Sequence, residues 1–516
     1  MESKRILGDK AKDLISSNPE GAIALYLEIY KSYSDQFNDW DAMYAMKALR
    51  ACQKPDLVWG RKLVGVYKDE KVASMYGWLV FDHCVKGREK ADILFNEKII
   101  EELPKISPQK DTSIANSYPC PTTICVFELA DAYAENQFNA FKINELLSNI
   151  DYKLLSDRSK KIDTEKKGEI ELASTREKYF ALKTKSLLKL RAFSECYELG
   201  KLALSTLKSF HYNNDLWFKM RLAISLDKLG KFHESESLFR ELLSSKEGSD
   251  KWFLYRDIAE VYFENKDYQK AWKYAVDASY YGNEPHFLIN LYLLQARILF
   301  KIDRPHDGRL LAELIGSILS EQGWNVKSEF KRLFEHYAID IEKLPPLAET
   351  LKKAQLFWNS ERYAKMARKK GAIISIHKIG KTGRIKDESG QIVNFHKKDI
   401  LKKVKSLEDL ENATVEFYEM VKEDGSMVAE SIMILEDKNK PQHSEDMVGK
   451  VFDGKVKNLA DYGIFVHIPK NSDGLMHKND MPLELKEIFK DKFTIGQSLK
   501  VRVVRVSSKG INLALA

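Results

Sequence analysis

The 516-residue sequence has only five cysteines, and their positions argue against a metal site. They are an odd number scattered over the first 200 residues, and only the two in "CPTTIC" lie close together. No second Cys/His pair follows at the spacing of a zinc site, so we expect reduced, mostly buried thiols and no bound metal.

Long apolar runs are absent as well. No segment reaches the about 18 uninterrupted apolar residues of a membrane helix, and "MESKRILGDKAKDLISSNPEG" lacks the apolar core of a signal peptide. We therefore expect a cytoplasmic protein without a membrane partner.

Motifs of common catalytic sites are also missing. The sequence has no phosphate-cradling glycine loop with its lysine, no paired-histidine metalloprotease helix, no carboxylate cluster at two-metal spacing and no nucleophile elbow. The expectation is a protein that is not an enzyme and uses no cofactor.

The length and composition indicate two to four globular domains, because the chain is too long for one core. The net charge of +7 is distributed unevenly. Residues 361–410 carry +8, residues 411–446 carry −7 and residues 447–516 carry +5, which leaves +1 for residues 1–360. A polyanion would therefore meet the C-terminal third of the chain.

From about residue 10 to residue 370, apolar residues recur at helical spacing, as in "EGAIALYLEIYKSY". Segments between residues 175 and 320 resemble one another when shifted by 36 to 39 residues. Each has a small residue in a first helix, a turn, an aromatic residue and a second small residue three positions later. Small residues let two antiparallel helices approach closely, so the pattern predicts a solenoid of stacked helix pairs.

This pattern resembles the tetratricopeptide repeat family over residues 151–345, and more loosely over residues 1–150. The repeats exceed the usual family length, and Pro305 stands where the third aromatic should be. A generic helical solenoid remains open as an alternative. The resemblance implies that first helices line a concave groove, which would bind a protein partner through Lys185, Arg221, Lys228, Arg256 and Arg297. It also places there Lys178, Lys189 and Lys301, interleaved with Asp227, Asp257, Glu260 and Glu264.

The period changes near residue 371, after a connecting helix expected within residues 346–370. Five short alternating strands with glycine turns over residues 371–435 predict a small closed barrel of the OB type. The opening "G-x-I" and the "F-x-x-x-D-I" segment resemble the cold-shock domain. That resemblance implies RNA contacts through Lys378, Lys381, Arg384, Lys386, Phe395, Lys397 and Lys398. The exposed aromatics of that family are missing here, so a barrel that only spaces its neighbours is the alternative.

A short polar linker is expected at residues 436–446. Residues 447–516 then read "VGKVFDGKVKNLADYGIFVHI", "DGLMH", a short helix and "GQSLKVRVVRVSSKGINLAL". These anchors closely resemble the S1 domain, the RNA-binding unit repeated in a large bacterial ribosomal protein. The resemblance implies a second five-stranded OB barrel.

For this second barrel we expect a core of Val451, Val456, Val466, Leu475, Val501, Val503 and Leu513. The family resemblance implies that Tyr462, Phe465 and His477 lie on the outer face and stack on unpaired bases. Phosphates would be held by Lys455, Lys457, Lys500, Arg502, Arg505 and Lys509.

The sequence as a whole predicts an N-terminal α-helical solenoid followed by two β-barrels. We interpret it as a non-catalytic adaptor that binds single-stranded RNA and recruits a protein partner, in translation, at the ribosome or in RNA decay. Two alternatives remain open: an interaction scaffold without direct RNA binding, and a nuclease or nuclease subunit with an unrecognised site in the N-terminal 150 residues.

Overall fold

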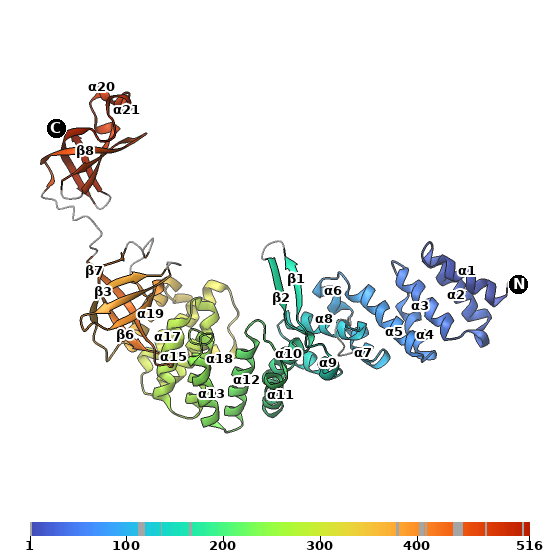
Figure 1. Ribbon diagram of the computed structural model, residues 1–516. Helices are drawn as coiled ribbons and strands as arrows, with labels where there is room; N and C mark the ends of the chain where they lie inside the picture. Colours follow the sequence, from blue (N-terminus) through green and yellow to red (C-terminus); the bar gives the residue numbers. More distant parts are fainter. Residues whose placement is uncertain are drawn as a thin grey trace. The chain divides into compact units, whose positions relative to one another are not determined.

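The computed structural model describes residues 3–111, 119–135, 137–164, 168–377, 381–401, 407, 410–436, 447–469, 472–507 and 510–516. The chain divides into two compact units, Met1–Arg362 and Tyr363–Ala516. The first is helical and the second consists of two closed five-stranded barrels, so the expected fold class is confirmed (Figure 1). None of the helices within the described residues is both long and apolar enough to cross a membrane.

The first part of the helical unit shares one apolar core that extends from Leu7 to Phe218. Its helices have the following bounds: α1 Lys4–Leu14, α2 Pro19–Ser32, α3 Asp39–Ala51, α4 Leu57–Val66, α5 Glu70–Val80, α6 Lys90–Phe95, α7 Glu97–Ile106, α8 Pro121–Glu135 and α9 Ala140–Leu147. Side-chain caps fix several N-termini; Asn38 and Asp41, for example, form a reciprocal capping box before and within α3.

A β-hairpin interrupts the helices where only helical repeats were expected. Strands β1 (Lys160–Thr164) and β2 (Gly168–Leu172) pair antiparallel, with Thr164 opposite Gly168. The strand signal is short: in β2 the acidic Glu169 and Glu171 alternate with Ile170 and Leu172, over only four residues within a sequence of helical periodicity.

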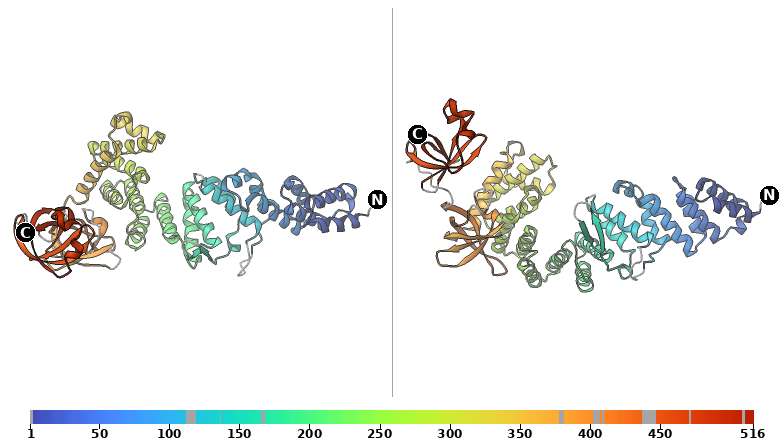
Figure 2. Two further views of the ribbon diagram at one scale, coloured as in Figure 1. Left: turned by 90° about the horizontal axis from the view of Figure 1, so that it is seen from above. Right: turned by 45° about the horizontal axis from the view of Figure 1, so that its top comes forward.

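Four helix pairs follow (Figure 2), and the same backbone turn joins the two helices of each pair. Their bounds are α10 Thr175–Lys189, α11 Phe193–Thr206, α12 Asn214–Lys228, α13 Phe232–Ser244, α14 Trp252–Glu264, α15 Tyr268–Tyr281, α16 Ile289–Lys301 and α17 Pro305–Gln322. The positions of Phe193, Phe232, Tyr268 and Pro305 each begin the second helix of a pair. Proline is well suited to this first helical position, because its missing N–H would have no partner there.

The turn inside each pair contains one residue with positive φ, two positions before the second helix: Arg191, Gly230, Lys266 and Asp303. The next residue donates its N–H back to the first helix over 2.9 Å, as Lys231 does to the carbonyl of Leu226. Between the paired helices, the hydroxyl of Ser235 donates to the carbonyl of Ala223 over 2.8 Å. Small residues therefore do bring the paired helices into close contact, as the repeat pattern predicted.

A second apolar core joins α12 to the end of the helical unit. It includes α18 (Ser328–Tyr337) and α19 (Leu347–Arg362), which lies within the expected connecting helix. Glu361 of α19 accepts hydrogen bonds from Trp272 and Arg304, and so ties α19 to α15 and to the start of α17.

The two barrels of the second unit have the same connectivity. The first contains β3 (Lys369–Ile376), β4 (Thr382–Asp387), β5 (Ile392–His396), β6 (Thr414–Val421) and β7 (Met427–Glu436), in the order β3-β4-β5-β7-β6. The second contains β8 (Val451–Ala460), β9 (Gly463–Ile468), β10 (Ser472–His477), β11 (Ser498–Ser507) and β12 (Gly510–Leu515), in the order β8-β9-β10-β12-β11. Two short helices, α20 (Leu483–Lys486) and α21 (Phe489–Lys492), follow β10. In both barrels the third and fifth strands pair parallel and the other neighbours pair antiparallel.

Candidate nucleic-acid interface

Paired residues on neighbouring strands point to the same face of a sheet, so the register of the second barrel defines an outer row across all five strands. Phe465 of β9 pairs with Asn458 of β8 on one side and with Leu475 of β10 on the other. Leu475 pairs with Asn512 of β12, which pairs with Arg505 of β11. A bulge after Val456 shifts β8 so that Asn458, and not Lys457, enters this row.

The three aromatic residues expected to bind bases gather at one end of this row. The Tyr462 ring, 48% exposed, lies 6.2 Å from the Phe465 ring in an edge-on arrangement and 6.3 Å from the His477 ring in a near-parallel one. Nδ1 of His477 accepts the N–H of Asn479 over 3.2 Å, which fixes the orientation of the imidazole. Outward rings at this spacing can stack on flat apolar groups.

Gly463 makes this arrangement possible. A Cβ at this position would lie 2.4 Å from the carbonyl oxygen of Met476, so no larger residue fits between β9 and β10. Gly463 pairs with His477, and the close approach of their strands brings Tyr462 to the same end of the sheet as the histidine.

The cations of the second barrel divide into free and paired ones. Lys455, Lys500, Arg502 and Arg505 are exposed and make no ion pair with the described residues. Lys457 forms an ion pair with Asp473, which also accepts a 2.7 Å contact from His467. The pKa of Asp473 lies below its ordinary value, mainly because of the contact with Lys457 and next because of the contact with His467. Lys457 is therefore less available for phosphate than predicted, and Lys509 lies outside the described residues.

Two of the expected core residues face outward instead. Val451 is 48% exposed because it lies four positions before Lys455 on β8 and therefore points to the same outer face. Leu475 belongs to the outer row, and its neighbour Met476 is fully buried in its place. The sequence "GLMH" has apolar residues at both parities, so only the strand register distinguishes them. Val456, Val466, Val501, Val503 and Leu513 are buried as predicted.

The outer row of the first barrel occupies the same strand positions with different side chains. It consists of Ser375, Arg384, Asn394, Val428 and Met420, in order from β3 to β6. Arg384 occupies the position of Phe465, and its Nε donates to the Ser375 hydroxyl over 3.0 Å. Exposed apolar side chains lie beside this row, with Ile392 50% and Val421 67% exposed.

The prediction that Phe395 contacts RNA is wrong. Its ring is only 3% exposed and lies in the core of the first barrel, where Gly383 makes room for it. Its parity on β5 is opposite to that of the outward Asn394. Of the expected basic contacts, Lys381, Arg384, Lys386 and Lys398 are exposed, Lys397 is half-buried and Lys378 lies outside the described residues.

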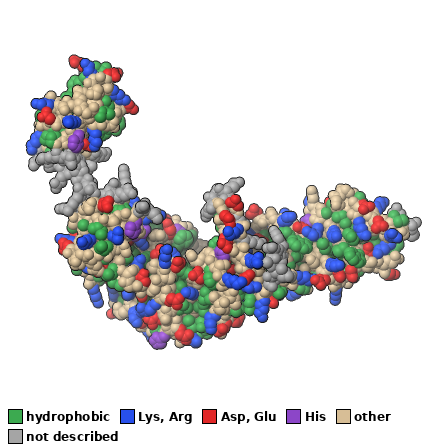
Figure 3. Space-filling model, viewed as in Figure 1, with side chains coloured by type: hydrophobic (Ala, Val, Ile, Leu, Met, Phe, Trp, Pro, Cys, Tyr) green, Lys and Arg blue, Asp and Glu red, His purple; other side chains and the backbone are tan. Residues whose placement is uncertain are grey.

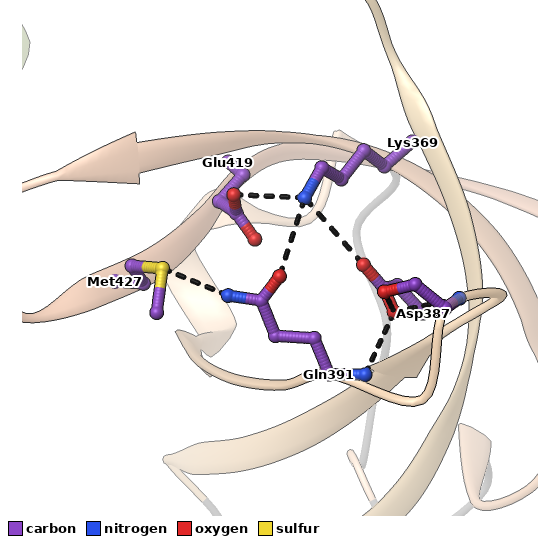
Figure 4. A network of polar contacts seen from close by, with 6 residues as sticks. Lys369, Asp387, Gln391, Glu419 and Met427 are labelled. Atoms are coloured by element: carbon purple, nitrogen blue, oxygen red, sulfur yellow. Dashed lines mark hydrogen bonds and ion pairs between the residues drawn. The ribbon is translucent and has the colours of Figure 1, made fainter.

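A polar network links β3, β4 and β6 of the first barrel (Figure 4). Lys369 Nζ donates to Glu419 over 2.8 Å and lies 3.5 Å from both Asp387 and Gln391. Asp387 in turn accepts the backbone N–H groups of Ser389 and Gln391 over 2.9 Å. The ammonium of Lys369 is therefore already engaged by Glu419 and Asp387 and is less available to a ligand than an unpaired lysine.

The residues predicted to line the helical groove fall into three groups. Lys228 pairs with Asp227 and Glu264, and Arg256 pairs with Asp257, so both are neutralised. Arg221 is only 7% exposed and donates to the Thr184 hydroxyl over 3.1 Å; its guanidinium is part of the helix packing and not of an open groove surface. Lys185 and Arg297 remain exposed, and each lies over an aromatic ring. Figure 3 shows basic and acidic side chains interspersed over the visible face of the helices.

No group of three or more His, Cys, Asp or Glu side chains among the described residues is arranged to hold a metal ion.

Comparison with known proteins places one part of this chain. Residues 445–516 match the S1 RNA binding domain. Over 66 residues the chain is 41% identical to a polyribonucleotide nucleotidyltransferase of Sphingopyxis alaskensis, which covers 13% of this chain and 9% of that protein. It is 33% identical over 104 residues to the small ribosomal subunit protein bS1 of Rhizobium meliloti, which covers 19% of this chain and 18% of that protein.

The chain thus spans less than a fifth of the length of either relative. Among solved structures, BtubC from P. vanneervenii matches 47% of this chain and 93% of its own with 13% identity and a TM-score of 0.30, too low to support an argument about the fold. The match to the S1 RNA binding domain, over residues 445–516, covers the second barrel with its aromatic triad and its free cations. The second barrel is therefore an S1 RNA-binding domain.

Proposed function

We propose that this protein is a non-catalytic RNA-binding adaptor. The second barrel binds single-stranded RNA, the first barrel adds electrostatic contacts, and the helical unit recruits a protein partner. Its setting is translation, the ribosome or RNA decay; the likeness to a small ribosomal subunit protein and to a polyribonucleotide nucleotidyltransferase supports this part of the proposal.

The observation that carries the proposal is the outward aromatic triad beside free cations on an S1 domain. Stacking on an aromatic ring contributes about 1–3 kcal/mol per base and tolerates any base, because every base has a π-face. Bases in a duplex are already stacked on one another, so the platform should favour single strands.

Fluorescence anisotropy with a labelled single strand, and with the same strand in a duplex, tests RNA binding by the full chain. The single strand should bind in a salt-dependent manner and the duplex poorly. A fragment of residues 363–516 should bind nearly as well as the full chain, since the positive excess lies after residue 360. If the fragment binds RNA more weakly than the full chain by more than about 1.4 kcal/mol, a factor of ten, the main RNA site lies in the helical unit.

The same reagents separate the two alternatives. An interaction scaffold would show no salt-sensitive RNA binding, either as the full chain or as the fragment. A nuclease would shorten the labelled strand when incubated with a divalent metal, whereas an adaptor leaves it intact.

A further inference from the structure

A pocket of about 660 Å³ lies in the helical unit between α14, α16 and α18. Its floor is apolar and is formed by Phe263, Leu293, Ala296, Phe300 and Leu333. Phe300 is 50% exposed, and it lies among the other apolar residues of the pocket and not singly on the surface. The volume lies in the range of about 300–1,000 Å³ that is typical of ligand pockets.

The rim of this pocket is positively charged and largely unneutralised. Lys266, Arg297, Lys301 and Arg332 line it, and none forms an ion pair with a residue in the described part of the chain. Of the two carboxylates in the lining, Glu264 is paired with Lys228, which leaves Glu329 to face four cations. An occupant with negative charge would complement this rim.

The details of the lining favour a peptide over a nucleotide. The guanidinium of Arg297 covers the face of Phe263 at 4.7 Å, and the His336 ring approaches Phe300 edge-on at 5.0 Å. Because Arg297 already covers the face of Phe263, this ring is less open to a stacking base than an uncovered ring would be. A pocket with an apolar floor and a basic rim instead suits a peptide in which carboxylates flank one apolar side chain. Interfaces commonly have this arrangement, in which a buried apolar anchor is surrounded by polar contacts.

We propose that this pocket captures an acidic peptide segment of a partner protein, with one apolar side chain seated on Phe300 and Leu333 and with carboxylates at Arg297, Lys301 and Arg332. The inference rests on the proposed recruiting role of the helical unit and gives it a location. The proposed capture site does not include Arg221, which is part of the helix packing, or Arg256, which is paired with Asp257.

A selection of short random peptides on the full-length chain tests the proposal. The enriched peptides should be rich in Asp and Glu around one apolar residue. Anisotropy with the best peptide should then show at least about a tenfold loss of affinity for Arg297→Glu/Lys301→Glu and for Phe300→Ala. The matched control is Lys246→Glu/Lys352→Glu, which changes the charge equally at exposed lysines outside the pocket and should bind the peptide as the wild type does.

Several results would overturn the proposal: no enrichment, enriched peptides without acidic residues, unchanged affinity in both pocket variants with unchanged melting temperature, or displacement of the peptide by oligoadenylate. The RNA affinity of Arg297→Glu/Lys301→Glu should remain at the wild-type value. If the pocket fails while a pull-down with residues 1–362 still recovers a partner, the recruiting role survives without this site. If RNA binding fails, the adaptor proposal falls whatever the peptide does.

Discussion

The two barrels share strand order, bulge position in the first strand and a histidine that closes the third strand, yet their outer faces differ in chemistry. Phe465 and Leu475 of the second barrel correspond to Arg384 and Asn394 of the first. In the first barrel Phe395 lies in the core, one position along β5 from Asn394 of the outer row. The same fold therefore has an outward aromatic cluster in one barrel and a polar, basic surface in the other, because strand register decides whether a side chain points into the core or outward.

The largest expected effect is a loss of stability. Phe395→Ala empties space in the core of the first barrel and should destabilise it by about 3–5 kcal/mol. Calorimetry of the full chain should show an earlier transition for the first barrel, while the affinity for single-stranded RNA stays close to wild type. An unchanged melting profile with weaker RNA binding would place Phe395 on the surface after all.

Phe465→Ala should have the opposite outcome. It removes an outward ring, so RNA affinity should fall by about 1–3 kcal/mol while the melting temperature is preserved, and His477→Ala should behave alike. Ile495→Ala, which truncates another exposed apolar side chain of the second barrel, is the control and should leave RNA affinity unchanged. If Phe465→Ala instead lowers only the melting temperature, the ring belongs to the core.

Arg384→Phe sharpens the comparison by adding a ring where the first barrel lacks one. The affinity for single-stranded RNA should increase by about 1 kcal/mol, because stacking on the new ring outweighs the phosphate attraction of the arginine that it replaces. Arg384→Leu removes the same charge without adding an aromatic face and is the matched control. Equal affinities of the two variants would mean that the outer face of the first barrel does not reach the bound strand.

A smaller effect is expected for the free cations. Lys500→Ala and Arg502→Ala should each reduce the slope of log affinity against log salt by about 0.7, the value for one phosphate contact on a single strand. Lys457→Ala should change the slope less, because Asp473 already neutralises this lysine. Titrations at several salt concentrations check both, and equal slopes for Lys457→Ala and Lys500→Ala would contradict this distinction.

The smallest effect concerns the histidine that closes β5 of the first barrel. Burial lowers the pKa of His396, Asp399 opposes this, and Lys398, Lys381 and Lys422 lower the pKa further. Below about pH 6.5 the unfolded chain therefore binds a proton that the folded barrel resists, so stability should decrease as the pH falls from neutrality toward about 5.5. His396→Gln should flatten this part of the melting-temperature profile, and an equally steep profile would assign the effect to other groups.

Much of the architecture could be predicted from the sequence because the relevant patterns are local. Helical periodicity and the repeat of small and aromatic residues predicted the paired helices, and the structure shows that the aromatic position, or Pro305 in the fourth pair, is where the second helix begins. Glycine turns and short alternating strands predicted the first barrel, and the resemblance to the S1 domain predicted the second. The hairpin β1–β2 was missed because its alternation of acidic and apolar residues spans only four positions in β2, within a region where helical periodicity dominates.

The candidate site was predicted less evenly. Tyr462, Phe465 and His477 lie together as the resemblance implied, but Phe395, Val451 and Leu475 were placed on the wrong face. In each of these three cases the residue type suits either face, and a shift of one position along a strand exchanges core for surface. The groove cations could not be sorted in advance, because their neutralising carboxylates come from elsewhere in the fold as well as from their own helix.

By itself the sequence determined the order of the domains, the helical and strand periods and the uneven distribution of charge, since each of these depends only on residues that are close together in the chain. Only the tertiary structure decided which outward side chains meet across five strands, which cations keep an unpaired charge, and that α14, α16 and α18 enclose a pocket. These properties depend on strand register and helix stacking, and both are set by contacts between residues far apart in the chain.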